Sequence, residues 1–166
     1  MSTNVQLCLK IVINLVFKDD GNKILMIQEA KEHSRGLWFF PAGKGKEAEL
    51  ITDSCIRETL EESGIKTKPV NLLKIEHVVR RVFFDKDEEP KAIDIFRFIF
   101  VSDALDDNLK TNETKDSIQA KWIPIEEVKD LPLRSIEVLS YIDEYQNQKK
   151  RQHLANLSDI LEAYND

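Results

Sequence analysis

The sequence lacks the features that mark several large classes of protein. Its 166 residues include only two cysteines, Cys8 and Cys55, which excludes a disulfide framework and favours a reducing, cytoplasmic compartment. No apolar run approaches the roughly 20 residues that a membrane-spanning helix needs, and Met1–Gln6 lack the basic and apolar segments of a signal peptide. With 24 basic and 30 acidic residues, the net charge of −6 argues against polymeric nucleic acid as a partner.

The overall composition is that of an ordinary folded domain. Hydrophobic residues make up 42% of the chain and charged residues 33%, which are values typical of globular proteins. No repeat, low-complexity tract or Pro/Gly/Ser linker interrupts the sequence. We expect one domain over residues 1–146, followed by a polar, helical C-terminal extension over residues 147–166 that docks on the domain or binds a partner.

Hydrophobic periodicity predicts an α+β fold. A buried strand is expected over Leu7–Phe17, and the turn cluster Asp19–Asn22 joins it to a second strand as a hairpin. The strands expected after the first are Lys23–Gln28, Leu37–Phe40, Leu72–Phe84, Ile93–Val101 and Ala120–Ile123. The expected helices are Leu50–Ser63, which Gly64 ends, Ile125–Val128 and Ser135–Gln146. Strands and helices do not alternate regularly, which argues against repeated βαβ units.

The strongest chemical signal is an acidic helix face. At about 100° per residue, Glu58, Glu61 and Glu62 fall within a sector of roughly 100°. Thr59 and Leu60 lie on about the opposite side, which can enter a core. Like charges three and four residues apart destabilise an isolated helix, so a cation that neutralises the cluster explains it best. Carboxylate oxygens suit hard divalent ions, Mg²⁺ or Mn²⁺.

An arginine precedes this face at a spacing that suggests a support. Glu49, Asp53 and Arg57 are four residues apart, so Arg57 can tie the loop carboxylate to the helix.

These residues and their intervals resemble the Nudix box, Gly-x5-Glu-x7-Arg-Glu-U-x-Glu-Glu-x-Gly-U, in which U is a bulky aliphatic residue. The matching residues are Gly43, Glu49, Arg57, Glu58, Glu61, Glu62, Gly64 and Ile65. Thr59 departs from the box at its first aliphatic position, and Ala42 and Ala48 stand where glycines are common.

The resemblance implies a Nudix fold, a mixed β-sheet sandwiched between α-helices, and Mg²⁺- or Mn²⁺-dependent cleavage of a diphosphate joined to another moiety. It implies that Glu58, Glu61 and Glu62 hold the metal and act in catalysis. It implies a structural role for four of the other box residues, Gly43, Glu49, Arg57 and Gly64.

The carboxylates of such a site explain how it could hydrolyse a diphosphate. Carboxylate-held metal ions neutralise the diphosphate and lower the pKa of a bound water that attacks phosphorus. Glu62 is our choice for the general base among the box residues, and a loop carboxylate is the alternative. The resemblance also implies a fourth catalytic carboxylate in the loop before the Trp-bearing strand. Asp116 lies six residues before Trp122, and Glu113 is the alternative.

Further stretches resemble more specifically the animal MutT-homologue branch, which hydrolyses 8-oxoguanine nucleoside diphosphates. They are Leu25–Lys31, Arg35–Trp38, Pro41–Gly43, Ser117–Trp122 and Leu131–Arg134. The implied reaction converts 8-oxo-(d)GDP and water to the monophosphate and phosphate, which sanitises the nucleotide pool. The alternatives are ADP-ribose, dinucleoside polyphosphates or nucleotide sugars as substrates, and a non-catalytic nucleotide-binding module.

Base recognition requires an apolar platform and a few polar groups. Only one of Phe39 and Phe40 can face the site, because neighbouring side chains on a strand point to opposite faces. For every aromatic candidate, packing in the core is the alternative. The candidates are Phe39, Phe40, Phe96, Phe98 and Trp122 for stacking, Gln28 and Asn14 for the base edge, and Lys44, Lys46, Arg80, Arg81 and Arg97 for phosphate.

Overall fold

The computed structural model describes residues 7–18, 21–82, 90–110 and 112–163, with the backbone alone for residue 7 and residues 153–163. The predicted turn residues Asp19 and Asp20 lie outside the described residues. The strands are β1 (Leu7–Lys18), β2 (Lys23–Glu29), β3 (Trp38–Phe39), β4 (Ala42–Lys44), β5 (Thr67–Val82), β6 (Lys91–Ala104) and β7 (Ser117–Pro124). The helices are α1 (Ile51–Ser63), α2 (Glu137–Ala163) and the short 3-10 helices η2 (Glu32–Ser34) and η3 (Ile125–Asp130).

Among the described residues, seven strands form one mixed sheet in the order β3-β2-β1-β6-β5, with β4 paired to β1 and β7 paired to β2. Strand β1 is parallel to β6 and antiparallel to β2 and β4. The expected hairpin of β1 and β2 is confirmed, because Phe17 lies opposite Ile24. Strand β1 is central, and its residues from Val12 to Val16 are all buried. The predicted α+β fold with a mixed sheet is confirmed.

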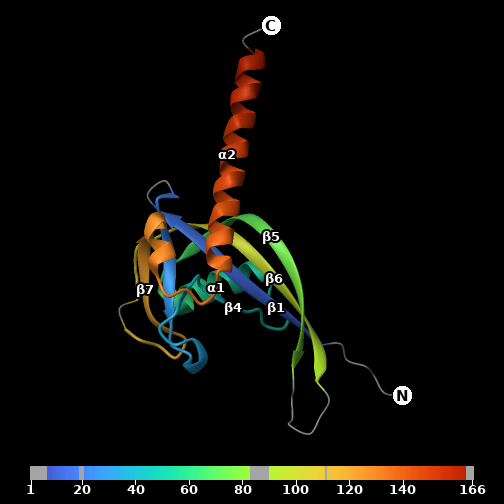
Figure 1. Ribbon diagram of the computed structural model, residues 1–166, viewed down its shortest axis with the longest axis vertical. Helices are drawn as coiled ribbons and strands as arrows, with labels where there is room; N and C mark the ends of the chain where they lie inside the picture. The colour runs from blue at the N-terminus through green and yellow to red at the C-terminus, as the bar shows by residue number, and fades with distance from the viewer. Residues whose placement is uncertain (1–6, 19–20, 83–89, 111, 164–166) are drawn as a thin grey trace, which may run out of the picture. The chain divides into compact units, whose positions relative to one another are not determined.

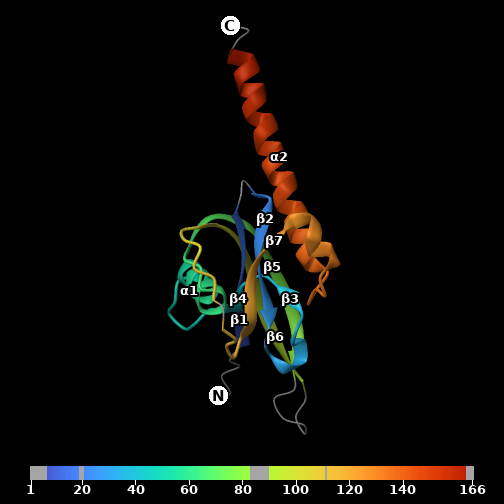
Figure 2. The ribbon, with the colours of Figure 1, turned by 90° about the vertical axis from the view of Figure 1, so that its left-hand side faces the viewer.

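Helix α1 covers one face of the sheet, which Figure 2 shows along an edge. Val12 of β1, Cys55 of α1 and Phe100 of β6 form a buried cluster beneath the helix. The partly buried Ile51 and Phe98 pack against that cluster. These apolar contacts fix α1 to the two central strands, since burial of apolar surface is the dominant favourable term in folding.

Both ends of α1 lie within one residue of the expected positions. Gly64 ends the helix with a φ of 83°, and its N–H donates to the carbonyl of Leu60 at 2.9 Å. Glycine adopts this left-handed conformation without the strain that a Cβ brings. A Cβ at Gly64 would also lie 2.5 Å from the carbonyl oxygen of Asn108, so a neighbouring loop requires glycine there too.

The buried face of α1 differs from the predicted one. Leu60 was expected to enter the core, but its side chain is 39% exposed. Thr59 is buried as expected, but Glu62, from the acidic face opposite it, is buried as well, as is Ser63. The helix is therefore rotated so that one carboxylate of the acidic cluster points toward the sheet and the others remain nearer to solvent.

Strand β5 begins at Thr67, five residues before the expected start at Leu72. Pro69 lies in this added segment and has no N–H to donate to a neighbouring strand. However, β5 lies at the edge of the sheet, where proline is tolerated. The register with β6 shifts between Pro69 and Asn71, which is a local irregularity of the kind that accommodates proline. In Figure 1, β5 and β6 run side by side as a long curved hairpin.

The chain divides into two compact units, one ending at Arg134 and the other beginning at Ser135. The second unit contains α2, a helix of 27 residues. The helix expected over Ser135–Gln146 and the helical extension expected after it are therefore one element as far as Ala163. None of the helices in the described part of the chain has the length and apolar character needed to cross a membrane.

Candidate active site

The candidate active site lies where strand β4 packs against helix α1. Strand β4 is held on the central strand, with Gly43 opposite Val12. A Cβ at Gly43 would lie 2.5 Å or less from all three carboxyl atoms of Glu58, whereas ordinary contacts begin at 3.4 Å. The glycine therefore allows the Glu58 carboxylate to lie directly against the backbone of β4.

Arg57 joins the acids of the helix to the loop that precedes it. Its Nε and Nη2 donate to the two oxygens of Glu49 at 2.7 and 3.0 Å, and Nη2 also donates to the carbonyl of Lys44 at 3.0 Å. Its Nη1 donates to Glu58 at 2.6 Å and to Glu61 at 3.3 Å. The hydrogen bonds from Arg57 hold the pKa of Glu49 well below its usual range, and Glu49 in turn raises the pKa of Arg57. The expected tie between Arg57 and Glu49 is therefore present.

The loop between β4 and α1 is organised around the carboxylate of Glu49. Its Oε2 accepts hydrogen bonds from the N–H of Lys46 at 2.9 Å and from the hydroxyl of Ser54 at 2.6 Å. Ala48 takes a φ of 56°, in the left-handed region. Only glycine adopts this region without strain, so the replacement of the common glycine by Ala48 leaves local strain in the loop.

Glu62 is the most buried acid of α1, with 3% of its surface exposed. Its Oε2 accepts a hydrogen bond from the N–H of Ala42 at 2.9 Å. Burial, reinforced by the charges of Glu29 and Glu58, raises the pKa of Glu62 to about 8, against the opposing effects of the Ala42 N–H and Lys31. Burial and the neighbouring negative charges thus favour the neutral form of the Glu62 carboxyl group.

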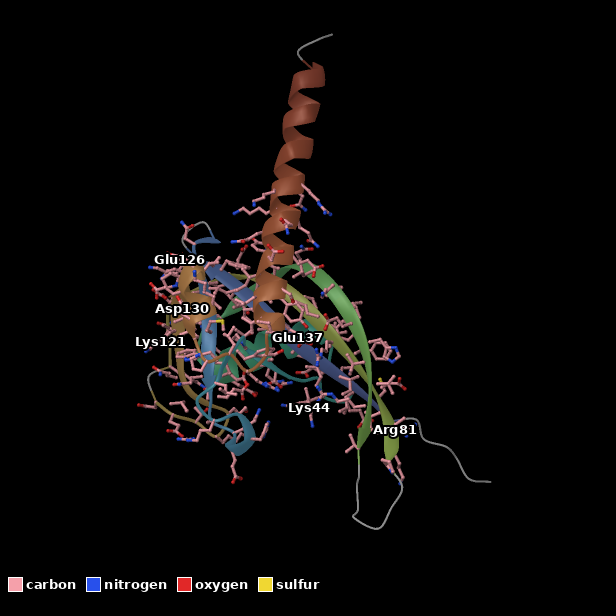
Figure 3. The ribbon with its side chains drawn as sticks, viewed as in Figure 1. Lys44, Arg81, Lys121, Glu126, Asp130 and Glu137 are labelled. Carbon is pink, nitrogen blue, oxygen red and sulfur yellow. The ribbon has the colours of Figure 1, made fainter. Side chains whose placement is uncertain are left out.

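A cleft of about 690 Å³ adjoins these residues and combines carboxylates with cations. Its acids are Glu58, Glu61 and Asp116, and Arg57 lies among them. Lysine ammonium groups bind phosphate as point charges, whereas carboxylates suit hard metal ions. Figure 3 labels Lys44, which extends from the end of β4. The lysines that line the cleft are Lys31, Lys44, Lys46, Lys110 and Lys115.

The two acids proposed for the fourth carboxylate take different positions. Asp116 lines the cleft, and its Oδ1 lies 3.5 Å from Nζ of Lys31. Glu113 instead accepts a hydrogen bond from Nη2 of Arg35 at 2.8 Å. Of the two alternatives, the geometry favours Asp116.

Trp122, a candidate for base stacking, anchors the loop that follows β6. Its Nε1–H donates to Asp107 at 2.8 Å, and Lys18 donates to the same carboxylate at 2.6 Å. These two hydrogen bonds, that from Lys18 being the stronger cause, lower the pKa of Asp107. Further along the loop, the N–H of Lys110 donates to the carbonyl of Ser63 at 2.8 Å. Trp122 thus helps to hold the loop that carries Lys110 to the cleft.

The aromatic candidates are largely occupied by packing. Phe40 is fully buried and presents no face on which a base could stack, because it packs in the core. Phe39 is 6% exposed, and the guanidinium of Arg134 lies 5.0 Å from its ring centroid. Phe96 stacks on His77 with ring centroids 4.6 Å apart. None of these rings is part of the cleft lining.

The polar candidates Gln28 and Arg97 also lie outside the cleft lining. The amide of Gln28 donates to the carbonyl of Gly36 at 2.9 Å and accepts from Gln119 at 2.7 Å. Arg97 donates to Glu76 of the neighbouring strand at 3.4 Å. The cleft therefore brings together four box residues, two candidate lysines and Asp116, and the base-recognition candidates described above lie outside its lining. The box residues are Gly43, Arg57, Glu58 and Glu61, and the lysines are Lys44 and Lys46.

The sequence reasoning missed Glu29, which influences the site through its charge. Its carboxylate is 2% exposed and accepts a hydrogen bond from Arg134 at 2.7 Å. The pairing of β2 with β7 shifts register between Gln28 and Glu29, and such irregularities often redirect a side chain beside a site. The sequence feature that could have identified Glu29 is its position as an acid at the end of β2, a largely buried strand.

Comparison with known proteins gives a family and named relatives. A model of the NUDIX domain matches residues 9–142. Two relatives, described as 8-oxo-dGDP phosphatase NUDT18 of Danio rerio and of Mus musculus, are each 34% identical to this chain over 134 residues. The matches cover 80% of this chain but 37% of each relative, so the chain spans little more than a third of their length.

Solved structures give the same fold. A NUDIX hydrolase from Nitrosomonas europaea superposes with a TM-score of 0.67 over 85% of this chain and 90% of that chain. Its sequence is 23% identical, so the likeness concerns the fold alone.

Proposed function

The chain belongs to the NUDIX family, and we propose that it is a Mg²⁺- or Mn²⁺-dependent hydrolase of oxidised purine nucleoside diphosphates, 8-oxo-(d)GDP above all. The observation that carries this proposal is the cleft in which Glu58 and Glu61 meet at Arg57 among five lysines. The substrate is proposed from the named relatives, which are described as 8-oxo-dGDP phosphatases.

The donor chemistry of the cluster fits a hard divalent cation. Glu58 and Glu61 already converge on one cationic atom, Nη1 of Arg57, at 2.6 and 3.3 Å. Their oxygens, with that of Glu62, are the ligands that Mg²⁺ and Mn²⁺ prefer. Within the described ranges no three carboxylate, histidine or cysteine side chains converge on a single point, so Glu62 would have to turn from Ala42 to complete the set. When bound, the metal would neutralise the diphosphate and acidify a water.

The other residues of the cleft have roles that follow from their charge. Lysines such as Lys44 and Lys110 would hold the phosphate oxygens, since ammonium groups bind phosphate as point charges. Glu62, or Asp116 from the loop, would take the proton from the attacking water. One P–O bond forms and one breaks, which yields the nucleoside monophosphate and inorganic phosphate. We also propose a cytoplasmic site of action, because both cysteines are free.

Phosphate release from 8-oxo-dGDP, with Mg²⁺ and with EDTA, tests the reaction. We expect Glu61→Gln and Glu62→Gln to lower kcat by orders of magnitude at near-native stability, because amides keep the shape of the side chain and lose its charge. Near-native rates in both variants would contradict the assignment of the metal site.

A matched pair of loop variants identifies the fourth carboxylate. Asp116 lines the cleft, whereas Glu113 is paired with Arg35. We expect Asp116→Asn to reduce kcat and Glu113→Gln to leave it within a few-fold of the wild-type value. The reverse order would transfer the role to Glu113.

A further inference from the structure

The departure of this chain from the Nudix box at Thr59 is accompanied by an unusual set of buried hydrogen bonds. Thr59 is fully buried, where the box has an aliphatic side chain. Its hydroxyl donates to the carbonyl of Cys55 at 2.8 Å and accepts from Nδ2 of Asn14 at 2.7 Å. A buried hydroxyl without partners is destabilising, and here both of its hydrogen-bonding functions are used.

Asn14 is the polar residue in the buried centre of β1, with 1% of its surface exposed. Besides its bond to Thr59, its Oδ1 accepts from the hydroxyl of Ser102 on β6 at 2.7 Å. Its backbone N–H donates to the carbonyl of Pro41 at 2.9 Å. One residue thus joins α1, β6 and the segment before β4.

The partners of Asn14 flank the acids of the candidate active site. Thr59 directly follows Glu58 and lies three residues before Glu62 on α1. Pro41 directly precedes Ala42, whose N–H holds the Glu62 carboxylate at 2.9 Å. Asn14 therefore fixes both the helix that carries these acids and the strand against which they lie.

We propose that Asn14 is a positioning residue of the active site, which sets the place of α1 over β4 and thereby the separation of the Glu58 and Glu62 carboxylates. An aliphatic side chain at this position of the box can contribute packing but no hydrogen bond. In this chain a directional contact, the Asn14–Thr59 hydrogen bond, holds the helix at this point. The catalytic part of this inference rests on the proposed function, but the metal-binding part is measured separately.

Paired threonine variants test the proposal on the full chain. Thr59→Val restores the aliphatic residue of the box but leaves the Asn14 amide without its acceptor. Thr67→Val is the matched control, because the Thr67 hydroxyl is buried and has no hydrogen-bond partner among the described residues. Thr59→Ser keeps the hydroxyl and should rescue the function.

The readouts are Mn²⁺ affinity by electron paramagnetic resonance, and kcat and KM with Mg²⁺. We expect Thr59→Val and Asn14→Leu to weaken Mn²⁺ binding and lower kcat by about 10-fold, the lower end of the effect of losing a direct partner of a metal ligand, because Asn14 acts one contact further away. KM should change little, because the lysines of the cleft are untouched. Thr67→Val and Thr59→Ser should behave as wild type.

A merely structural role predicts a different result. If the folded Thr59→Val and Asn14→Leu proteins lose stability but keep wild-type Mn²⁺ affinity and kcat, the positioning role is refuted. If the wild-type chain hydrolyses no nucleotide while Thr59→Val still weakens Mn²⁺ binding, the proposed function fails and the positioning role stands. The two failures are therefore distinguishable.

Discussion

Replacement of Gly43 by alanine is the perturbation whose effect the structure predicts in most detail. The new Cβ would lie 2.5 Å or less from Cδ and both oxygens of Glu58, and ordinary contacts begin at 3.4 Å. The carboxylate must therefore withdraw by about 1 Å or more. Metal–ligand distances normally lie within about 0.2 Å of their standard values, and a misplacement of about 1 Å can reduce a rate roughly 100-fold.

We accordingly expect Gly43→Ala to lower kcat/KM for 8-oxo-dGDP by about 100-fold in a phosphate-release assay. The free energy of unfolding should fall by less than about 1 kcal/mol, because the clash involves the end of a flexible side chain rather than backbone. Thermal unfolding then separates the loss of activity from a loss of folding.

Gly45→Ala, just after the end of β4, provides the matched control. A Cβ at Gly45 would lie 3.2 Å from the hydroxyl of Ser54, which needs to move by only a few tenths of an ångström. We expect Gly45→Ala to keep kcat/KM within a few-fold of wild type. If Gly43→Ala is equally active, the contact between Glu58 and β4 does not position a catalytic group, and the reasoning is refuted.

Three further predictions concern strain, thiol burial and the guanidinium network. Ala48→Gly should raise the free energy of unfolding, measured with denaturant, by about 0.5–1 kcal/mol. Relief of the left-handed strain gains about 1–2 kcal/mol, which exceeds the entropic cost of glycine, about 0.5–1 kcal/mol. An unchanged unfolding midpoint would contradict the strain at Ala48. Iodoacetamide at pH 8 should modify only the exposed Cys8 in the native protein, since burial raises the pKa of Cys55 to about 12 and keeps it a thiol; equal labelling of both would show that Cys55 is accessible. Arg57→Lys should lower kcat about 10–100-fold, because one ammonium cannot reproduce the bonds to Glu49, Glu58 and Lys44; a wild-type kcat would assign Arg57 no role in placing the acids.

The sequence was most informative where local chemistry determines the structure. Gly64 marked the end of α1 because glycine is the residue that takes a left-handed φ at a helix end. The intervals of the box likewise indicated that Arg57 can reach Glu49, which the structure confirms at 2.7 Å. The helix end and the Arg57–Glu49 contact both involve residues that are close in the sequence. Sequence spacing alone is therefore enough to predict them.

Features that depend on tertiary contacts could not be predicted in the same way. Strand alternation could not tell that Phe40 is fully buried, because it does not say which face of a sheet is covered. The helical wheel places Glu62 with Glu58 and Glu61, but it cannot show that Glu62 turns toward the sheet, where the Ala42 N–H donates to its carboxylate at 2.9 Å. Asn14, a sequence candidate for base recognition, instead hydrogen-bonds to Thr59, which is 45 residues away in the sequence, and to Ser102.

The measurement that tests the central claim most directly is phosphate release by the wild-type chain in Mg²⁺ from 8-oxo-dGDP, 8-oxo-GDP, GDP and 8-oxo-dGTP, in parallel with ADP-ribose and diadenosine polyphosphates. A phosphatase is added for products that lack a free phosphate. The account predicts the highest kcat/KM for the oxidised diphosphates and complete loss of activity in EDTA. A preference for ADP-ribose or the polyphosphates would contradict the proposed substrate, and nucleotide binding without any hydrolysis would contradict the proposed enzyme.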